Sequence, residues 1–115
     1  MSARKDVVER YIEGFRRSDH AQILSCLTDD IVWELRGNKT LRGKEAFDGE
    51  IENDEFDSPM LTIDRLVKEG DTVVATGSGS VAKKGGETLR FVFCEVFSFT
   101  DDAVSRLDTY HVWLR

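Results

Sequence analysis

The chain opens with two segments whose apolar residues recur at the spacing of an amphipathic helix. The first segment, residues 4–17, predicts a helix with one face on a core, because its apolar residues are Val7, Val8, Tyr11, Ile12 and Phe15. The pair Ser18-Asp19 interrupts this pattern, and Asp19 is a suitable N-cap for a second helix. We expect residues 28–30 to end that second helix, whose apolar residues are Ala21, Ile23, Leu24 and Leu27.

The middle of the chain mixes one strand with one short helix. Residues 31–35 (Ile-Val-Trp-Glu-Leu) have strand composition, and Gly37-Asn38 turns the chain. A short helical segment follows Gly43, with apolar residues three to four positions apart: Ala46, Phe47 and Ile51. It leads into an acidic run without basic residues between positions 48 and 57, which we interpret as a solvated helix end and loop.

After Pro59 the pattern changes to strands joined by short polar turns. The predicted strands cover residues 60–68, 72–82, 88–100 and 103–114. The resulting order is helix, helix, strand, helix and then a meander of four strands. Helices segregated from antiparallel strands are typical of an α+β fold, and we expect residues 1–115 to form one domain.

Composition and charge exclude several classes of function. The net charge is −6 at pH 7, with no basic face for nucleic acid, and no stretch approaches the ~20 apolar residues of a membrane span. The N-terminus lacks the apolar region of a secretory signal, and the distant Cys26 and Cys94 are typical of reduced thiols. With only two histidines and no Cys or His cluster, we expect a cytoplasmic protein without a metal or cofactor.

The strand over residues 91–99 carries the main functional signal. Side chains alternate between the two faces of a strand, so one face holds Phe91, Phe93, Glu95, Phe97 and Phe99. The opposite face is also largely apolar, with Val92, Cys94, Val96 and Ser98. We therefore expect one face to line an interior and the other to pack on a partner sheet, for which a second subunit is one source.

Glu95 is out of place among phenylalanines and has two interpretations. A carboxylate in apolar surroundings is costly unless it is paired, hydrogen-bonded or protonated. It either reaches an arginine such as Arg65 or Arg106, or water at the strand's end, or it is a pocket carboxyl group whose pKa is raised by its surroundings. In the second case it can donate a hydrogen bond to a developing oxyanion.

The strand over residues 72–80 contains a Gly-Ser-Gly-Ser run, which is weak as a strand former and suggests a bend. Val74 and Thr76 share a face with Ser78 and Ser80. This face is interpreted either as the concave wall of a ligand site or as the solvated face of an edge strand.

Five short motifs in this order resemble the nuclear transport factor 2-like superfamily, in particular its SnoaL-like and ketosteroid-isomerase-like branches. They are Val8-Glu-Arg-Tyr-Ile12, Leu27-Thr-Asp-Asp-Ile31, Leu41-Arg-Gly-Lys-Glu45, Glu69-Gly-Asp-Thr-Val73 and Glu95-Val-Phe-Ser-Phe99. The resemblance covers nearly the whole chain. It implies a cone of strongly curved antiparallel sheet, closed by three helices around one pocket, and a homodimer formed through the sheet's outer face.

The resemblance also implies candidate catalytic residues. Tyr11 and Glu95 fall on the tyrosine and the acid that form the oxyanion hole of the steroid isomerases. The position of the isomerase's general base is occupied by Leu35, which cannot carry a proton. Aligning the last strand turns Leu107, Thr109 and His111 inward, where a neutral His111 opposite Glu95 would serve as base; the alternative is a surface or interface histidine.

The expected pocket wall is apolar, and each of its residues has core packing as the alternative role. Besides the catalytic candidates, the wall comprises Phe15, Trp33, Leu35, Phe47, Ile51, Phe56, Val74, Thr76, Phe91, Phe93, Phe97, Leu107 and Thr109. The expected ligand is an apolar small molecule with one or two oxygens, and the acidic run at the mouth would disfavour strongly anionic ligands. Two functions follow: a cofactor-free isomerase, cyclase or dehydratase, or a non-catalytic dimeric binding or interaction module.

Overall fold

The structure is a computed structural model that describes residues 3–114. Its three helices are α1 (Ala3–Arg16), α2 (His20–Leu24) and α3 (Lys44–Ile51). Its six strands are β1 (Leu27–Leu35), β2 (Lys39–Arg42), β3 (Met60–Glu69), β4 (Thr72–Ala82), β5 (Thr88–Thr100) and β6 (Ala103–Trp113). No helix in this part of the chain has the length and apolar character needed to cross a membrane.

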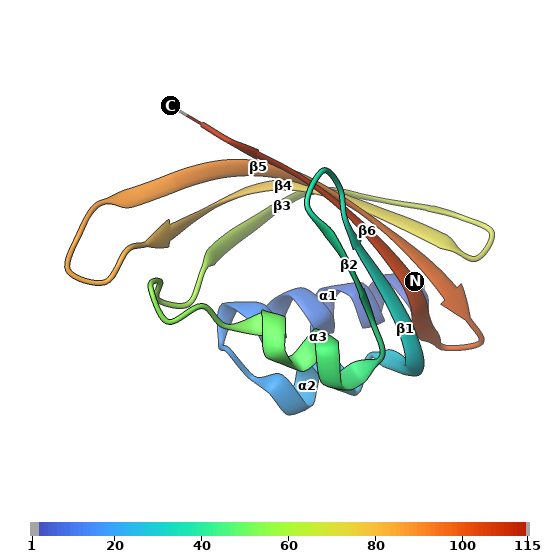
Figure 1. Cartoon of the computed structure of the whole chain (residues 1–115). Coiled ribbons are helices and arrows are strands. Elements are labelled where there is room, and N and C mark those ends of the chain that lie inside the picture. The colour runs from blue at the N-terminus through green and yellow to red at the C-terminus, as the bar shows by residue number, and fades with distance from the viewer. Residues whose placement is uncertain (1–2, 115) are drawn as a thin grey trace.

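The strands form one curved sheet in the order β2-β1-β6-β5-β4-β3. Neighbouring strands are antiparallel except β1 and β6, which are parallel. The sheet arches over the three helices, which all lie on its concave side (Figure 1). The α+β class and the curved sheet with three helices are confirmed.

Two local predictions were wrong. Residues 28–30 do not end the second helix: α2 ends at Leu24, and β1 already begins at Leu27. The spacing from Ile23 to Leu27 fits either a longer helix or a helix followed by a strand, and pairing of Leu27 with Val104 of β6 decides for the strand. Residues 39–42 form an additional strand, β2, which lies at the edge of the sheet and pairs with β1.

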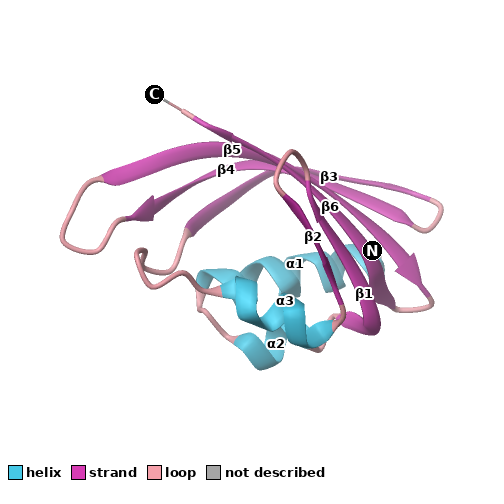
Figure 2. Ribbon diagram, in the orientation of Figure 1, coloured by secondary structure: helices cyan, strands magenta, loops and turns pink. Residues whose placement is uncertain are grey.

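The inner face of the sheet is divided into a filled part and an open part. Near the turn between β5 and β6, Phe97, Phe99, Val104 and Leu107 are buried in the main core. Further along the same strands, the inward residues line a pocket instead. The helix α1, which lies on the concave side of the sheet (Figure 2), completes the core and buries Val8, Tyr11 and Ile12.

Strand register decides which residues of β4 face the helices. Ala75, Gly77 and Gly79 lie opposite Glu95, Phe93 and Phe91 of β5, and residues directly opposite in an antiparallel pair share a face. A Cβ added to Gly77 would lie 2.8 Å from the Phe93 ring, and one added to Gly79 2.6 Å from the Phe91 ring. The glycines therefore leave room for these rings on the concave side.

The placement of Val74 and Thr76 on the concave wall was consequently wrong. Their β5 partners are Val96 and Cys94, so both side chains lie on the outer face with Ser78. The alternation along β4 is visible in the sequence, but only the pairing with β5 tells which set points inward.

Candidate functional site

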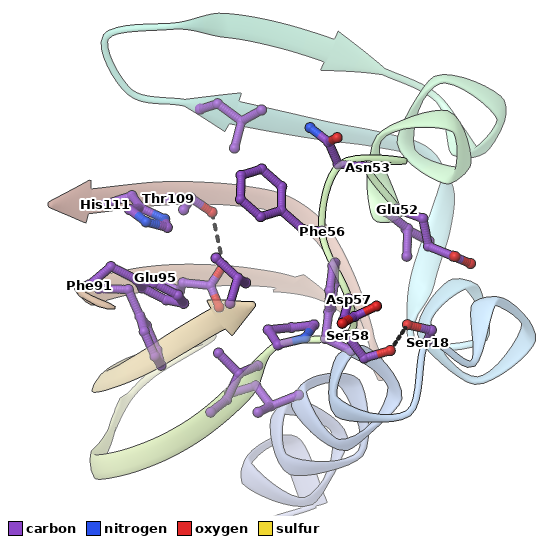
Figure 3. Close-up of a pocket in the computed structure, with 18 of the residues that line it drawn as sticks. Ser18, Glu52, Asn53, Phe56, Asp57, Ser58, Phe91, Glu95, Thr109 and His111 are labelled. Atoms are coloured by element: carbon purple, nitrogen blue, oxygen red, sulfur yellow. Dashed lines mark hydrogen bonds between the residues drawn. The ribbon is translucent and has the colours of Figure 1, made fainter. Parts of the chain in front are cut away.

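A pocket of about 460 Å³ lies between the inner face of β5 and β6, the helix α1 and the loop after α3. Figure 3 shows Glu95 and Thr109 on neighbouring strands, with Phe56 reaching toward them from the loop. Glu95 and Thr109 lie opposite each other in the β5–β6 register. They stand where the filled core ends and the pocket begins.

Glu95 is held by a short chain of hydrogen bonds that starts at Trp33. The indole Nε1–H of Trp33 donates to Oγ1 of Thr109 at 2.9 Å. The Thr109 hydroxyl donates to Oε2 of Glu95 at 2.9 Å, drawn as a dashed line in Figure 3. Trp33 is itself fixed by stacking on Phe47, with ring centroids 4.1 Å apart.

The carboxyl group of Glu95 has no cationic partner within residues 3–114. Arg106 instead pairs with Asp108 at 3.0 Å, and Arg65 is exposed. The interpretation of Glu95 as half of an ion pair was therefore wrong. Burial raises the pKa of Glu95 from 4.5 to about 7, against the opposing effect of the Thr109 hydrogen bond.

Tyr11 is among the residues that line the same pocket. Its side chain is buried, and its hydroxyl oxygen has no hydrogen-bond partner among residues 3–114. Burial, together with the nearby charges of Glu95 and Cys26, raises the pKa of Tyr11 well above 10.0. The phenol therefore stays protonated at neutral pH and keeps its hydroxyl proton as a hydrogen-bond donor.

His111 lies beyond Thr109 on the pocket side of β6. It is opposite Phe93 in the register and stacks on Phe91 with ring centroids 4.3 Å apart. Burial lowers the pKa of His111, so the imidazole is neutral at neutral pH. Trp113 extends this aromatic wall, with its ring centroid 4.5 Å from that of His111.

The mouth of the pocket is polar and is formed by the segment after α3. Its lining residues include Glu52, Asn53, Phe56, Asp57, Ser58 and, from the turn between β4 and β5, Lys84. Two backbone hydrogen bonds of 2.9 Å tie the loop to this turn, from Asp57 N to Ala82 O and from Lys84 N to Glu55 O. His20 on α2 bridges the carboxylates of Asp48 and Glu52 through its two ring nitrogens.

Most of the predicted site residues are brought together in this pocket. Those that line it are Tyr11, Phe15, Trp33, Leu35, Ile51, Phe56, Phe91, Phe93, Glu95, Thr109 and His111. Phe47, Phe97 and Leu107 lie in the filled core instead. Over residues 3–114, no group of three or more His, Cys, Asp or Glu side chains is arranged to hold a metal ion.

Sequence reasoning expected the acidic run at the mouth, from which Glu52 and Asp57 line the pocket, but it missed Trp113 and the polar residues Ser18, Asn53 and Lys84. Trp113 continues the alternation of Leu107, Thr109 and His111 along β6, so the pattern contained a signal for it. Ser18, Asn53 and Lys84 carried no such signal, since they reach the pocket only through the way the loops fold back.

Comparison with known proteins agrees with this geometry. The SnoaL-like domain model matches residues 8–107, whereas no curated protein sequence matches the chain. An NTF2-like protein of unknown function from Burkholderia pseudomallei has a similar structure, with a TM-score of 0.87 at 19% identity over 96% of this chain and 91% of that chain.

Two further solved structures are similar at low identity. A protein from Xanthomonas campestris provisionally named a polyketide cyclase has a TM-score of 0.86 at 22% identity, over 94% of this chain and 89% of that chain. An LEH-like epoxide hydrolase from M. tuberculosis has a TM-score of 0.84 at 20% identity, over 95% and 82%. At these identities the likeness establishes the fold, and the domain match establishes the family. The chain belongs to the SnoaL-like domain family.

Proposed function

We propose that this protein binds an apolar, oxygen-bearing small molecule in the pocket and catalyses a cofactor-free isomerisation, cyclisation or dehydration. The observation that carries the proposal is Glu95, a carboxyl group on the pocket wall with a pKa of about 7. Similar folds named as a cyclase and an epoxide hydrolase support small-molecule chemistry as the type of function.

A pKa near ambient pH suits Glu95 for proton transfer in either direction. General acid–base catalysis is most efficient when the catalytic pKa lies near the working pH. The unpartnered Tyr11 hydroxyl would donate to the ligand oxygen and stabilise negative charge that develops there. Leu35, also on the pocket wall, leaves no carboxylate at the usual base position, so the base is Glu95 or the neutral His111.

Proton abstraction can be tested before the substrate is known. We would follow hydrogen–deuterium exchange next to the carbonyl of 2-tetralone in D₂O by NMR, because any enolising site accelerates this step. Wild-type protein is expected to accelerate exchange above the buffer rate, and Glu95→Gln to abolish the acceleration. The exposed Glu69→Gln is the matched control and should behave as wild type.

The alternative is a non-catalytic binding module, which Leu35 favours because it removes the usual base. Binding of 2-naphthol, a neutral planar phenol, separates the two functions when it is measured by fluorescence titration. Binding without accelerated exchange supports the module and contradicts the enzyme. If Glu95→Gln unfolds more easily and leaves both readouts unchanged, Glu95 is structural and the proposed role of Glu95 in proton transfer fails.

We also propose a homodimer formed through the outer face of the sheet. Exposed apolar residues gather on that face of β5 and β6, namely Val92, Tyr110 and Val112. Light scattering after size-exclusion chromatography should give a dimer that Val112→Lys converts to a monomer. A monomeric wild type at micromolar concentration would refute this proposal.

A further inference from the structure

The hydrogen bonds that end at Glu95 have a fixed direction. An indole N–H can only donate, so the Thr109 oxygen must accept from Trp33. A threonine hydroxyl carries a single proton, and the acceptor within reach of that proton is Oε2 of Glu95. The second oxygen, Oε1, has no hydrogen-bond partner within residues 3–114 and belongs to a side chain that lines the pocket.

We propose that Thr109 is a positioning residue: oriented by Trp33, its hydroxyl keeps Oε2 of Glu95 as an acceptor and leaves Oε1 as the oxygen that exchanges a proton with the ligand. This inference rests on the proposed function for the identity of the proton-transfer group. It changes the role of Thr109, which the sequence had placed among residues that contact substrate.

Proton counting explains why the two oxygens of Glu95 differ. If the acidic proton were on Oε2, it would point at the Thr109 oxygen, and the Thr109 proton would lose its acceptor. A buried donor without an acceptor is costly, and Thr109 is only 7% exposed. The protonated form therefore carries its proton on Oε1, and the ionised form offers Oε1 as the basic oxygen.

Rigid surroundings hold this arrangement in place. Trp33 is 6% exposed and stacks on Phe47, which is fully buried. On its other side Glu95 pairs with Ala75 of β4, which has no polar side chain. Among residues 3–114, the hydroxyl of Thr109 is thus the group that directs the carboxyl group.

Other ionisable groups share the pocket but do not bond to this carboxyl group. They are Tyr11 from α1, His111 from β6, Glu52 and Asp57 from the segment after α3, and Lys84 from the turn between β4 and β5. The Thr109 hydrogen bond lowers the pKa of Glu95, while burial raises it. Removal of the hydroxyl should therefore raise that pKa further.

The test replaces Thr109 by valine, which has nearly the same shape but no hydroxyl, and by serine, which keeps the hydroxyl. The pKa of Glu95 is measured in the ligand-free protein by NMR titration of its ¹³C-labelled carboxyl carbon. We expect Thr109→Val to raise this pKa by about one pH unit or more, the size of a lost hydrogen bond to a charged group. Thr109→Ser should restore the wild-type value, and Trp33→Phe should shift it in the same direction as valine but less.

The pH profile of 2-tetralone exchange provides the second readout. In Thr109→Val, the part of the pH–rate profile that depends on ionised Glu95 should move to higher pH by the same amount as the pKa of Glu95. In Thr109→Ser this part of the profile should stay where it is in wild type. An unchanged Glu95 pKa in Thr109→Val overturns the inference; if that variant does not fold, an unchanged pKa in Trp33→Phe overturns it. A raised pKa in a protein without any exchange activity supports the hydrogen-bond arrangement and refutes the enzyme instead.

Discussion

Replacing Glu95 by glutamine should stabilise the protein, and by an amount that depends on pH. Glutamine keeps the shape of the side chain, and its amide oxygen can still accept from Thr109, as Oε2 does now. It cannot ionise, so it avoids the cost of a carboxylate in apolar surroundings. The perturbation therefore isolates the charge of Glu95 from its packing.

The magnitude follows from the two pKa values of the group. Glu95 ionises near 4.5 in an ordinary environment and at about 7 in the folded protein. Because one pKa unit corresponds to about 1.4 kcal/mol, the folded state binds the proton more tightly by up to about 3 kcal/mol. This stabilising contribution of protonated Glu95 is complete below pH 4.5 and is lost as the pH rises to about 7.

Urea unfolding of wild type and Glu95→Gln across this range measures the effect. The two proteins should differ little in free energy of unfolding below pH 4.5. The variant should become more stable than wild type by up to about 3 kcal/mol near pH 8. Glu69→Gln, on an exposed position of β3, should follow wild type throughout.

A constant difference between Glu95→Gln and wild type over the whole range would refute the reasoning. It would mean that Glu95 has the same pKa in the folded and unfolded chain. The pocket would then hydrate the carboxyl group fully, and the case for proton transfer at neutral pH would be lost.

Three further predictions concern other parts of the site and fold. Tyr11→Phe removes a buried hydroxyl without a hydrogen-bond partner among the described residues, so thermal unfolding should show a stability equal to that of wild type or higher by about 1 kcal/mol. The affinity for 2-naphthol should fall. An unchanged affinity would exclude the Tyr11 hydroxyl as a hydrogen-bond donor to the ligand. Gly77→Ala places a Cβ 2.1 Å from the backbone oxygen of Thr62 and should lower the free energy of urea unfolding by about 3 kcal/mol or more. Gly49→Ala in α3, where a Cβ meets nothing within 4 Å, is the control and should be neutral or stabilising. Equal changes in the free energy of unfolding for the two variants would contradict the packing argument. The pKa of His20 is raised by its hydrogen bonds to two carboxylates of the α3 region, so protonated His20 stabilises the fold at low pH and this contribution is lost as the pH rises. His20→Ala should therefore lower the free energy of unfolding more near pH 6 than near pH 9. A decrease that does not depend on pH would show that the charge of His20 is not involved.

The sequence by itself determined most of the elements, though not β2 or the end of α2, and it determined the unusual position of Glu95. Helical spacing around Val8, Tyr11 and Ile12 predicted α1, and alternation along β5 placed one carboxylate among phenylalanines. These features depend on the local periodicity of helices and strands, which a single chain segment contains in full. The turns after β3, β4 and β5 could be predicted for the same reason.

Only the tertiary structure decided what the alternation meant. Pairing between β4 and β5 turned Gly77 inward and Thr76 outward, and contact with β6 made Leu27 part of a strand. It also brought Trp33 to Thr109, 76 positions later in the chain, and so set the direction of the hydrogen bonds at Glu95. A strand's pattern specifies two faces but not which one is covered, because that depends on register and on partners that are distant in sequence.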